Sequence, residues 1–253
     1  MTALLLDVGN TRLKWGIAED GEIHRTGSIT QEKIRENGIG VLTSRLPRKI
    51  DAALVSNVAG TTFGTRLAGV IGAHCGCELR FAKSARNAHG VSNSYKNPRR
   101  LGVDRWVAMI GAWAELQSAC LIVDAGTAVT IDAIDDDGCH LGGQILPGVV
   151  LMADALAEHT SDLPPTKPGA AGAYAGLDMF GRNTRTAIGS GALMAVTGAV
   201  ERAIRTLRSN AYDASLVLTG GDASRILTAL EDSPLHRPYL VLHGLMQMLE
   251  QRR

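Results

Sequence analysis

Two copies of one short sequence pattern constrain the fold of this chain more than any other feature. An apolar run leads to Asp7–Gly9 (Asp-Val-Gly), and a similar run leads to Asp124–Gly126 (Asp-Ala-Gly). Each run predicts a buried strand with a carboxylate at its end, and the glycine lets the backbone turn tightly because it has no Cβ. Alternating apolar residues follow each copy, so we expect a second strand after each turn.

The spacing of the two copies indicates an internal duplication. Asp124 follows Asp7 by 117 residues (124 minus 7), and the pairs Asp20-Gly21 and Asp137-Gly138, which are typical of hairpin turns, keep the same spacing. A single Asp-x-Gly is ordinarily a turn in which the aspartate bonds its own backbone, whereas a paired copy in register favours a shared role toward phosphate or a metal. We therefore predict two homologous halves, 1–117 and 118–253.

Charge and hydropathy restrict the partners that this chain can have. The 26 Lys and Arg residues nearly balance the 25 Asp and Glu residues, so there is no long-range field to attract nucleic acid or an anionic membrane. No apolar run reaches the length of a membrane span, and the first residues lack the basic region of a signal peptide. We expect a cytoplasmic protein that binds neither nucleic acid nor membrane.

The cysteines do not follow the spacing of a zinc site. Cys75 and Cys77 are separated by one residue, and no second pair follows them at ligand spacing. Cys120 lies in an apolar run, where a small buried thiol is the ordinary interpretation. We expect reduced thiols.

Periodicity predicts the remaining elements. Further strands are expected at 51–58, 78–82 and 215–219, and helices at 30–37, 61–74, 101–117, 149–159, 182–207, 223–231 and 241–251. The segment 83–100 is polar and predicts a structured surface loop of the kind that often carries a site. The segment 161–176 is rich in Pro, Gly and Ala and predicts a loop or flap.

The first Asp-x-Gly loop has the groups that a phosphate site needs. Backbone N–H groups and side-chain donors at 9–12 can contact phosphate oxygens, and Lys14 adds a positive charge nearby. Asp7 is placed to anchor magnesium through water. The alternative for Asn10 and Thr11 is that they only stabilise the turn.

The second loop leaves two alternatives open. The Thr127 hydroxyl can contact phosphate, and Asp124 can either bind a cation or accept hydrogen bonds from loop N–H groups as a buried carboxylate. The stretch Gly220–Asp222 follows a strand, so it can approach an adenine or ribose closely or form a simple strand-to-helix turn.

The segment from Tyr95 to Arg105 has the groups needed to bind a small acceptor molecule. Tyr95 provides an aromatic wall with a hydroxyl, Asp104 a base, and Arg105 a fork for a carboxylate or phosphate. The alternative is that Asp104 and Arg105 belong to an exposed helical set of ion pairs.

These patterns together resemble the actin, hexokinase and Hsp70 superfamily of phosphotransferases and, within it, the type III pantothenate kinase family. The residues that carry the family resemblance are Asp7–Thr11, Tyr95, Asn97–Pro98, Leu101–Arg105, Asp124–Ala128, Gly142–Gly148, Asn183–Thr184 and Thr219–Asp222. The resemblance extends from residue 4 to Leu245.

The resemblance implies an α/β fold of two ribonuclease H-like (actin-like ATPase) domains, each a mixed five-stranded sheet flanked by helices. It implies ATP-dependent phosphorylation of pantothenate to 4′-phosphopantothenate, the first step of coenzyme A biosynthesis. It also implies a cytoplasmic homodimer that needs Mg²⁺ and a monovalent cation, K⁺ or NH₄⁺.

The resemblance also implies roles for individual residues. The ATP contacts fall on Asp7, Val8, Gly9, Asn10, Thr11, Arg12, Leu13, Lys14 and Thr127. The pantothenate contacts fall on Tyr95, Gly102, Val103, Asp104, Arg105 and Thr184, with Asp104 as the base. The monovalent cation falls on Asp124, although the next residue is Ala125 where the family often has cysteine.

Two other functions are compatible with parts of the sequence. Another kinase or phosphatase of the superfamily would keep both loops but would not need Tyr95 and Thr184. A non-catalytic accessory factor in transcription is the second alternative, since members of the family have been described in that role. The near-zero net charge and the lack of a helix-turn-helix pattern count against direct DNA binding.

Overall fold

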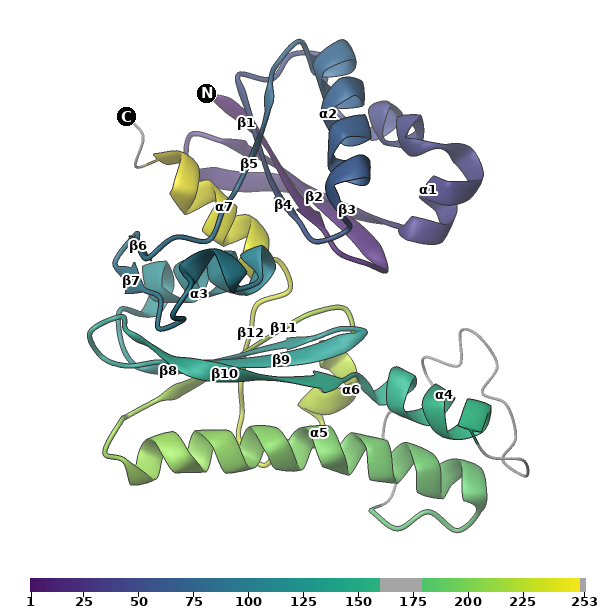
Figure 1. Cartoon of the computed structure of the whole chain (residues 1–253), viewed down its shortest axis with the longest axis vertical. Coiled ribbons are helices and arrows are strands. Elements are labelled where there is room, and N and C mark those ends of the chain that lie inside the picture. The colour runs from purple at the N-terminus through teal and green to yellow at the C-terminus, as the bar shows by residue number, and fades with distance from the viewer. Residues whose placement is uncertain (160–178, 251–253) are drawn as a thin grey trace. The chain divides into compact units, whose positions relative to one another are not determined.

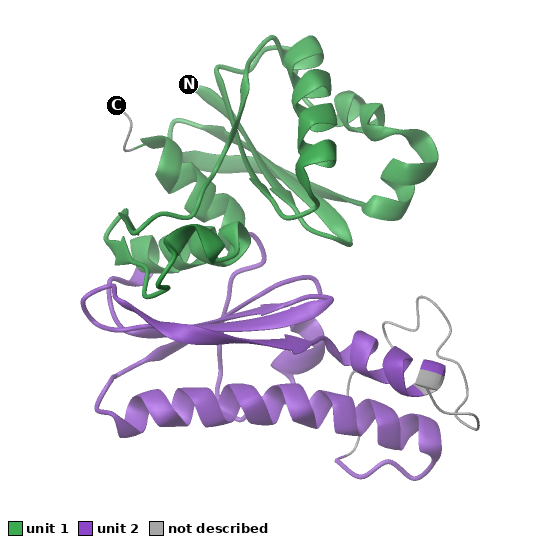
Figure 2. Cartoon of the chain, viewed as in Figure 1, with its two compact units in different colours: residues 1–115, 240–253 green, residues 116–239 purple. Residues whose placement is uncertain are grey.

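The computed structural model describes residues 1–159 and 179–250, and the flap predicted at 161–176 lies outside this range (Figure 1). The chain divides into two compact units, Met1–Glu115 with Leu240–Arg253 (unit 1) and Leu116–Tyr239 (unit 2) (Figure 2). No helix in the described ranges is both long enough and apolar enough to cross a membrane.

Unit 1 contains a mixed five-stranded sheet in the order β3-β2-β1-β4-β5, with β1 antiparallel to β2 and parallel to β4. Its strands are β1 (Thr2–Val8), β2 (Arg12–Glu19), β3 (Glu22–Thr30), β4 (Ala52–Asn57), β5 (Leu79–Phe81) and a small β6–β7 pair (Asn87–Ala88, Val91–Ser92). Its helices are α1 (Gln31–Asn37), α2 (Thr61–Cys75), α3 (Val103–Leu116), α7 (Leu240–Glu250) and the 3₁₀ helices η1 (Ile39–Arg45) and η2 (Pro98–Arg100).

Unit 2 repeats the same arrangement, with the strand order β10-β9-β8-β11-β12, β8 antiparallel to β9 and β8 parallel to β11. Its strands are β8 (Cys120–Ala125), β9 (Ala128–Ile134), β10 (His140–Pro147), β11 (Ser215–Thr219) and β12 (Leu235–His236). Its helices are α4 (Val149–His159), α5 (Thr184–Ser209) and α6 (Ala223–Leu227). The predicted fold class of two mixed five-stranded α/β domains is confirmed.

Alternation along β1 gives the first sheet two apolar faces. Leu4 and Leu6 pack in one buried cluster with Leu67 and Ile71 of α2. Leu5 is fully buried on the other face, where α7 contacts β1, β2 and β4. Because both faces are covered, the strand is a nearly continuous apolar run, as the sequence predicted.

The last helix packs with unit 1, although the predicted second half ran to residue 253. In α3 a Cβ on Gly111 would lie 2.6 Å from the Leu240 carbonyl oxygen, and in α7 a Cβ on Gly244 would lie 2.0 Å from the Val107 carbonyl oxygen. These two glycines therefore let α3 and α7 approach closely. The apolar pattern predicted the helix but contained no information on which sheet it would cover.

In unit 2 the core lies between the sheet and α5. Leu121, Val123 and Ile131 pack with buried α5 residues that include Leu193 and Val196. The side chains that alternate with them, including Asp124 and Asp132, lie on the other face of this sheet. Short elements such as β12 and η2 were not predicted because two or three residues are too few to show a period.

Candidate phosphate loops and acceptor site

The first phosphate loop connects β1 to β2. The Gly9 N–H donates to the Arg12 carbonyl oxygen at 3.0 Å, and a Cβ on Gly9 would lie 3.2 Å from the same oxygen, so the loop closes tightly on itself. Asn10, Thr11 and Arg12 are exposed at its tip. Val8 and Leu13 lie in the core, so of the predicted ATP residues these two can offer a ligand only backbone groups.

Three polar residues form a row across the end of the first sheet. Asp7 of β1 is the register partner of Lys14 on β2 and of Ser56 on β4, and register partners point to the same face of a sheet. Ser56 is 1% exposed, and its hydroxyl has no hydrogen-bond partner among the described residues. The row therefore places an ammonium group and a hydroxyl beside the carboxylate that was predicted to anchor magnesium.

Gln31 fixes the first loop from the start of α1. Its backbone N–H donates to the Thr11 carbonyl oxygen at 2.8 Å, and its side-chain Nε2 donates to the Gly9 carbonyl oxygen at 2.8 Å. The side chain is 7% exposed, which is low for a glutamine. Gln31 thus fixes two carbonyl groups of the loop, those of Gly9 and Thr11.

The second phosphate loop connects β8 to β9 and has the same frame. The Gly126 N–H donates to the Ala128 carbonyl oxygen at 3.1 Å, and Thr127 is exposed at the tip. Asp124 is half-buried and is the register partner of Thr130 and Thr219, so two hydroxyl-bearing side chains flank it on the same sheet face.

Backbone groups from two other segments close the second loop. The Gly148 N–H donates to the Thr127 carbonyl oxygen at 2.8 Å, and the Asp222 N–H donates to the Ala125 carbonyl oxygen at 2.9 Å. A Cβ on Gly220 would lie 2.2 Å from the Ala125 carbonyl oxygen, and Gly220 has a φ of 102°, which favours glycine. The stretch Gly220–Asp222 therefore packs directly on the second loop.

Sequence analysis missed Gln31, although the repeat contained a signal for it. Gln31 and Gly148 are 117 residues apart (148 minus 31), and their backbone N–H groups bond equivalent loop carbonyls, Thr11 and Thr127. Extending the register past the Asp-x-Gly patterns would have indicated that both positions support a loop.

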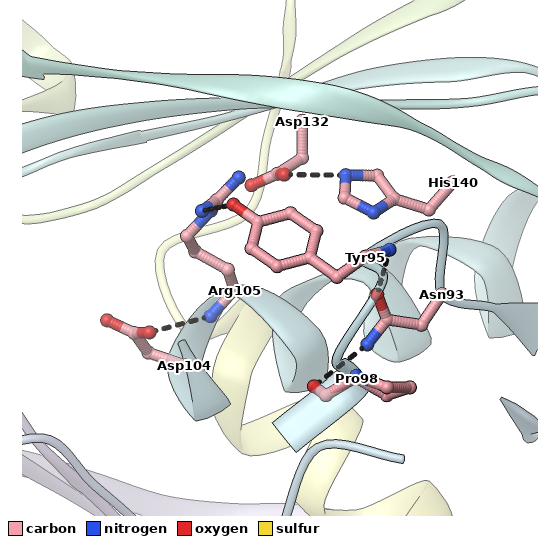
Figure 3. Close-up of polar contacts among 7 residues, drawn as sticks. All are labelled: Asn93, Tyr95, Pro98, Asp104, Arg105, Asp132 and His140. Atoms are coloured by element: carbon pink, nitrogen blue, oxygen red, sulfur yellow. Dashed lines mark hydrogen bonds and ion pairs between the residues drawn. The ribbon is translucent and has the colours of Figure 1, made fainter. Parts of the chain in front are cut away.

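In unit 1 the predicted acceptor residues come together (Figure 3). The Arg105 Nη1 donates to the Tyr95 hydroxyl at 3.0 Å, and the Arg105 guanidinium carbon lies 5.8 Å from the centre of the Tyr95 ring. Arg105 is only 6% exposed, so the alternative that Asp104 and Arg105 form an exposed ion-pair set is wrong for Arg105.

Asp104 lies in the first turn of α3, which begins at Val103. Its Oδ1 accepts a hydrogen bond from the Arg105 N–H at 2.8 Å, and the helix N-terminus favours the ionised carboxylate. A Cβ on Gly102 would lie 2.7 Å from the same oxygen. Glycine at 102 therefore leaves room for the carboxylate that was predicted to be the base.

Thr184, the last predicted acceptor residue, is exposed at the start of α5 in unit 2. The same unit contains a polar pair that sequence analysis did not anticipate. The His140 ring Nε2 lies 3.0 Å from the Asp132 Oδ1, and both side chains are buried (Figure 3). The hydrogen bond between these two buried side chains links β9 to the start of β10.

The oxygen groups at Asp7 fit a magnesium ion that is held mainly by water and phosphate. The described residues contain no group of three or more His, Cys, Asp or Glu residues that could hold a metal. Mg²⁺ commonly keeps several waters and takes only one or two carboxylates beside substrate phosphates. The Asp7 carboxylate lies next to the Ser56 hydroxyl, which has no hydrogen-bond partner in the described chain. These two oxygen groups suit such an ion.

The cysteines take no part in these sites. All four are free thiols, and Cys120 is fully buried in β8, as predicted. Burial raises the pKa of the Cys120 thiol to about 12, so it stays protonated at neutral pH. Burial also raises the pKa of Cys75 and of Cys77, which disfavours the reactive thiolate form.

Comparisons with known proteins agree with the motif set. The family model for type III pantothenate kinase matches residues 3–206. A type III pantothenate kinase from Azoarcus sp. (strain BH72) is 40% identical over 242 residues, which cover 96% of this chain and 88% of the relative. Another, from Methylobacillus flagellatus, is 36% identical over 259 residues, covering 97% of this chain and 96% of the relative.

Solved structures support the fold. A protein from Campylobacter jejuni assigned to the Baf family of transcriptional activators superposes with a TM-score of 0.64 at 20% identity, covering 98% of both chains. A 2-dehydro-3-deoxygalactonokinase structure from Sinorhizobium meliloti superposes with a TM-score of 0.55 at 16% identity, covering 99% of this chain and 98% of that one. At these identities the similarity concerns the fold alone.

Proposed function

Because this chain belongs to the type III pantothenate kinase family and phosphorylates pantothenate with ATP in coenzyme A biosynthesis, we propose a role in that reaction for each candidate residue. The family assignment replaces the first alternative, another kinase or phosphatase of the superfamily. The curated relatives are pantothenate kinases, which favours the kinase over a non-catalytic accessory factor. The observation that carries the proposal is the cluster of Tyr95, Asp104 and Arg105, a buried guanidinium next to a carboxylate at a helix N-terminus.

We propose that Tyr95 and the stretch 102–105 form the acceptor site of unit 1, and we keep Thr184 of unit 2 as a proposed pantothenate contact. Pantothenate carries a carboxylate and a primary hydroxyl. A guanidinium binds a carboxylate through two parallel hydrogen bonds, and Arg105 is held in place by the Tyr95 hydroxyl, so it loses little side-chain freedom on binding.

Asp104 is assigned as the base that orients the pantothenate hydroxyl. Phosphoryl transfer passes through a loose transition state in which positioning and electrostatic stabilisation contribute most. The carboxylate accepts a hydrogen bond from the substrate hydroxyl and takes its proton late in the transfer.

The ATP contacts are assigned to Asp7–Lys14 and to Thr127. Exposed loop donors at 10–12 and the Lys14 ammonium group would bind phosphate oxygens, and Asp7 and Ser56 would hold Mg²⁺. When bound, Mg²⁺ neutralises part of the negative charge of the triphosphate.

A monovalent cation, K⁺ or NH₄⁺, is assigned to Asp124. The support is the set of oxygen groups on one sheet face, the Asp124 carboxylate between its register partners Thr130 and Thr219. Hydroxyl and carboxylate oxygens are the donors that hard cations of low charge prefer.

A cytoplasmic homodimer is also proposed. Leu141 and Ile145 are exposed on the edge strand β10, Ile145 to 65%. Leu141 also lines a cavity of about 400 Å³, together with residues that include Leu121, Ala203 and Leu207. Exposed apolar surface at a sheet edge is typical of a protein interface. Sedimentation analysis of the Ile145→Glu variant tests this, because the charge would shift a dimer toward monomer.

A coupled kinase assay tests the catalytic assignment. Asp104→Asn should unfold at the wild-type temperature and lose about 100-fold or more in kcat, the range for removal of a general base. Omission of K⁺ from the wild-type assay tests the cation. A purified, folded Asp104→Asn enzyme with near-normal turnover would remove Asp104 from the role of base.

A further inference from the structure

Asn93 is a buried amide that links three points of the segment 83–100. Its Oδ1 accepts a hydrogen bond from the Tyr95 N–H at 3.0 Å, and its Nδ2 donates to the carbonyl oxygens of Ala85 at 3.1 Å and Pro98 at 3.2 Å (Figure 3 shows the Tyr95 and Pro98 bonds). The residue is 2% exposed. Three of the hydrogen bonds that this side chain can form are therefore made inside the segment.

The Asn93 backbone joins the same segment to Arg86. The Asn93 N–H donates to the Arg86 carbonyl oxygen at 2.8 Å, and the Arg86 Nη1 donates to the Asn93 carbonyl oxygen at 2.8 Å. The Arg86 Nη2 donates to the Lys96 carbonyl oxygen at 3.1 Å. Side-chain groups thus bond the backbone of a segment whose only regular structure is two short strands and one 3₁₀ turn.

Hydrophobic packing contributes little to the order of this segment. Val91 is the one buried apolar residue between 83 and 100, a stretch that is described throughout. Buried polar networks that are fully satisfied make a single conformation rigid, and loss of one member leaves its partners unsatisfied. The position of Tyr95 therefore depends on the hydrogen bonds of Asn93.

We propose that Asn93 is a positioning residue for the pantothenate site, which acts through Tyr95. The path has two hydrogen bonds: the Tyr95 N–H donates to the Asn93 Oδ1, and the Arg105 Nη1 donates to the Tyr95 hydroxyl. The inference rests on the proposed assignment of Tyr95 and Arg105 to pantothenate. Because neither step involves the loop at 9–12, the effect of Asn93 is specific to the acceptor substrate.

Two variants separate the bonds of Asn93. Asn93→Ala removes all three side-chain bonds, whereas Asn93→Ser keeps an oxygen that can accept the hydrogen bond from the Tyr95 N–H. Asn93→Ala should raise the KM for pantothenate about tenfold or more and leave the KM for ATP within twofold, since a misplacement of about 1 Å can cost a hundredfold. Asn93→Ser should recover part of this loss.

A matched control comes from the same unit. The Asn37 Nδ2 donates to the Lys33 carbonyl oxygen at 3.0 Å on the exposed end of α1. Asn37→Ala removes an asparagine hydrogen bond away from the candidate sites and should leave both KM values unchanged. Equal changes in both KM values of Asn93→Ala, or an unchanged KM for pantothenate in the folded variant, would overturn the proposal.

A double-mutant cycle with Tyr95→Ala tests the route. If Asn93 acts through Tyr95, Asn93→Ala should have less than a threefold effect on the KM for pantothenate once Tyr95 is alanine. Multiplicative effects would overturn the inference while leaving the Tyr95 assignment intact. If Tyr95→Ala alone leaves the KM for pantothenate unchanged in an active enzyme, the assignment of the acceptor site fails instead.

Discussion

The two phosphate loops share a backbone frame but differ in length and in what surrounds them. In each, a glycine N–H closes the loop, Gly9 to Arg12 and Gly126 to Ala128. Asp7 pairs with Lys14, seven residues later, whereas Asp124 pairs with Thr130, six residues later. The second loop is therefore one residue shorter than the first.

The one-residue difference is recovered in the following hairpins. Asp20 and Gly21 form a two-residue turn with φ values of 49° and 86°, as expected for a type I′ turn. The second hairpin is longer: the Asp135 Oδ1 accepts hydrogen bonds from the N–H groups of Asp137 and Cys139. The constant spacing of 117 thus joins two hairpin turns of different geometry, and the register is equivalent again at Gln31 and Gly148.

The two loops also differ in how they are held. A glutamine side chain bonds the first loop, whereas the second is packed against glycines at 148 and 220, where a Cβ would lie 2.2 Å from a loop carbonyl oxygen. The first loop carries Arg12 and Lys14, and the second has Ala128 and Thr130 at the corresponding places. This contrast favours phosphate with magnesium at the first loop and a cation of lower charge at the second.

The largest expected effect comes from adding a side chain at Gly220, where it packs on the second loop. Gly220→Ala would place a Cβ 2.2 Å from the Ala125 carbonyl oxygen at a φ of 102°, so the free energy of unfolding should fall by about 3 kcal/mol or more. Gly9→Ala, at 3.2 Å, should cost at most about 1 kcal/mol. Urea unfolding measures both, and Gly221→Ala, with no atom within 4 Å of its Cβ, is the control.

The next prediction distinguishes Asp7 from Asp124 by the ion on which each variant's activity depends. Asp7→Asn should lower kcat about 100-fold and raise the Mg²⁺ concentration needed for half-maximal rate, because it removes the carboxylate that we propose as the magnesium anchor. Asp124→Asn should instead change the K⁺ dependence. The measurement is the rate of each variant as a function of Mg²⁺ and of K⁺ concentration, with Mn²⁺ binding followed by electron paramagnetic resonance. The same response in both variants would contradict the assignment of different ions to the two loops.

A smaller effect is expected for Gln31, whose side chain bonds the first loop. Gln31→Ala leaves the Gly9 carbonyl oxygen without its 2.8 Å bond from Nε2, which should cost about 1–2 kcal/mol in unfolding free energy and raise the KM for ATP several-fold. The KM for pantothenate should stay unchanged. An ATP KM equal to that of the wild type would mean that the loop keeps its shape without Gln31.

The sequence predicted the sheet topology better than the contacts that hold the site residues in place. The Asp-x-Gly copies and the strand alternation are local signals, and both sheets formed as they indicated. The packing of α7 on unit 1 depends on the close contact of Gly111 and Gly244 with the backbone of the facing helix. A glycine occurs in helical sequences for many reasons, so the sequence alone does not reveal this contact. Asn93 lies in a polar segment, where only the folded backbone reveals that three partners converge on it.

The smallest expected effect concerns the hydroxyl next to Asp7. Ser56→Ala removes a buried hydroxyl that has no hydrogen-bond partner in the described part of the chain, so the unfolding free energy should stay within about 0.5 kcal/mol of the wild type or rise slightly. If Ser56 helps Asp7 to hold the water shell of magnesium, the variant should need two- to threefold more Mg²⁺ and bind Mn²⁺ correspondingly more weakly. Thr219→Val is its counterpart next to Asp124 and should leave the Mg²⁺ requirement unchanged. A loss of stability in Ser56→Ala with no change in the Mg²⁺ requirement would assign the hydroxyl to the fold rather than to the metal.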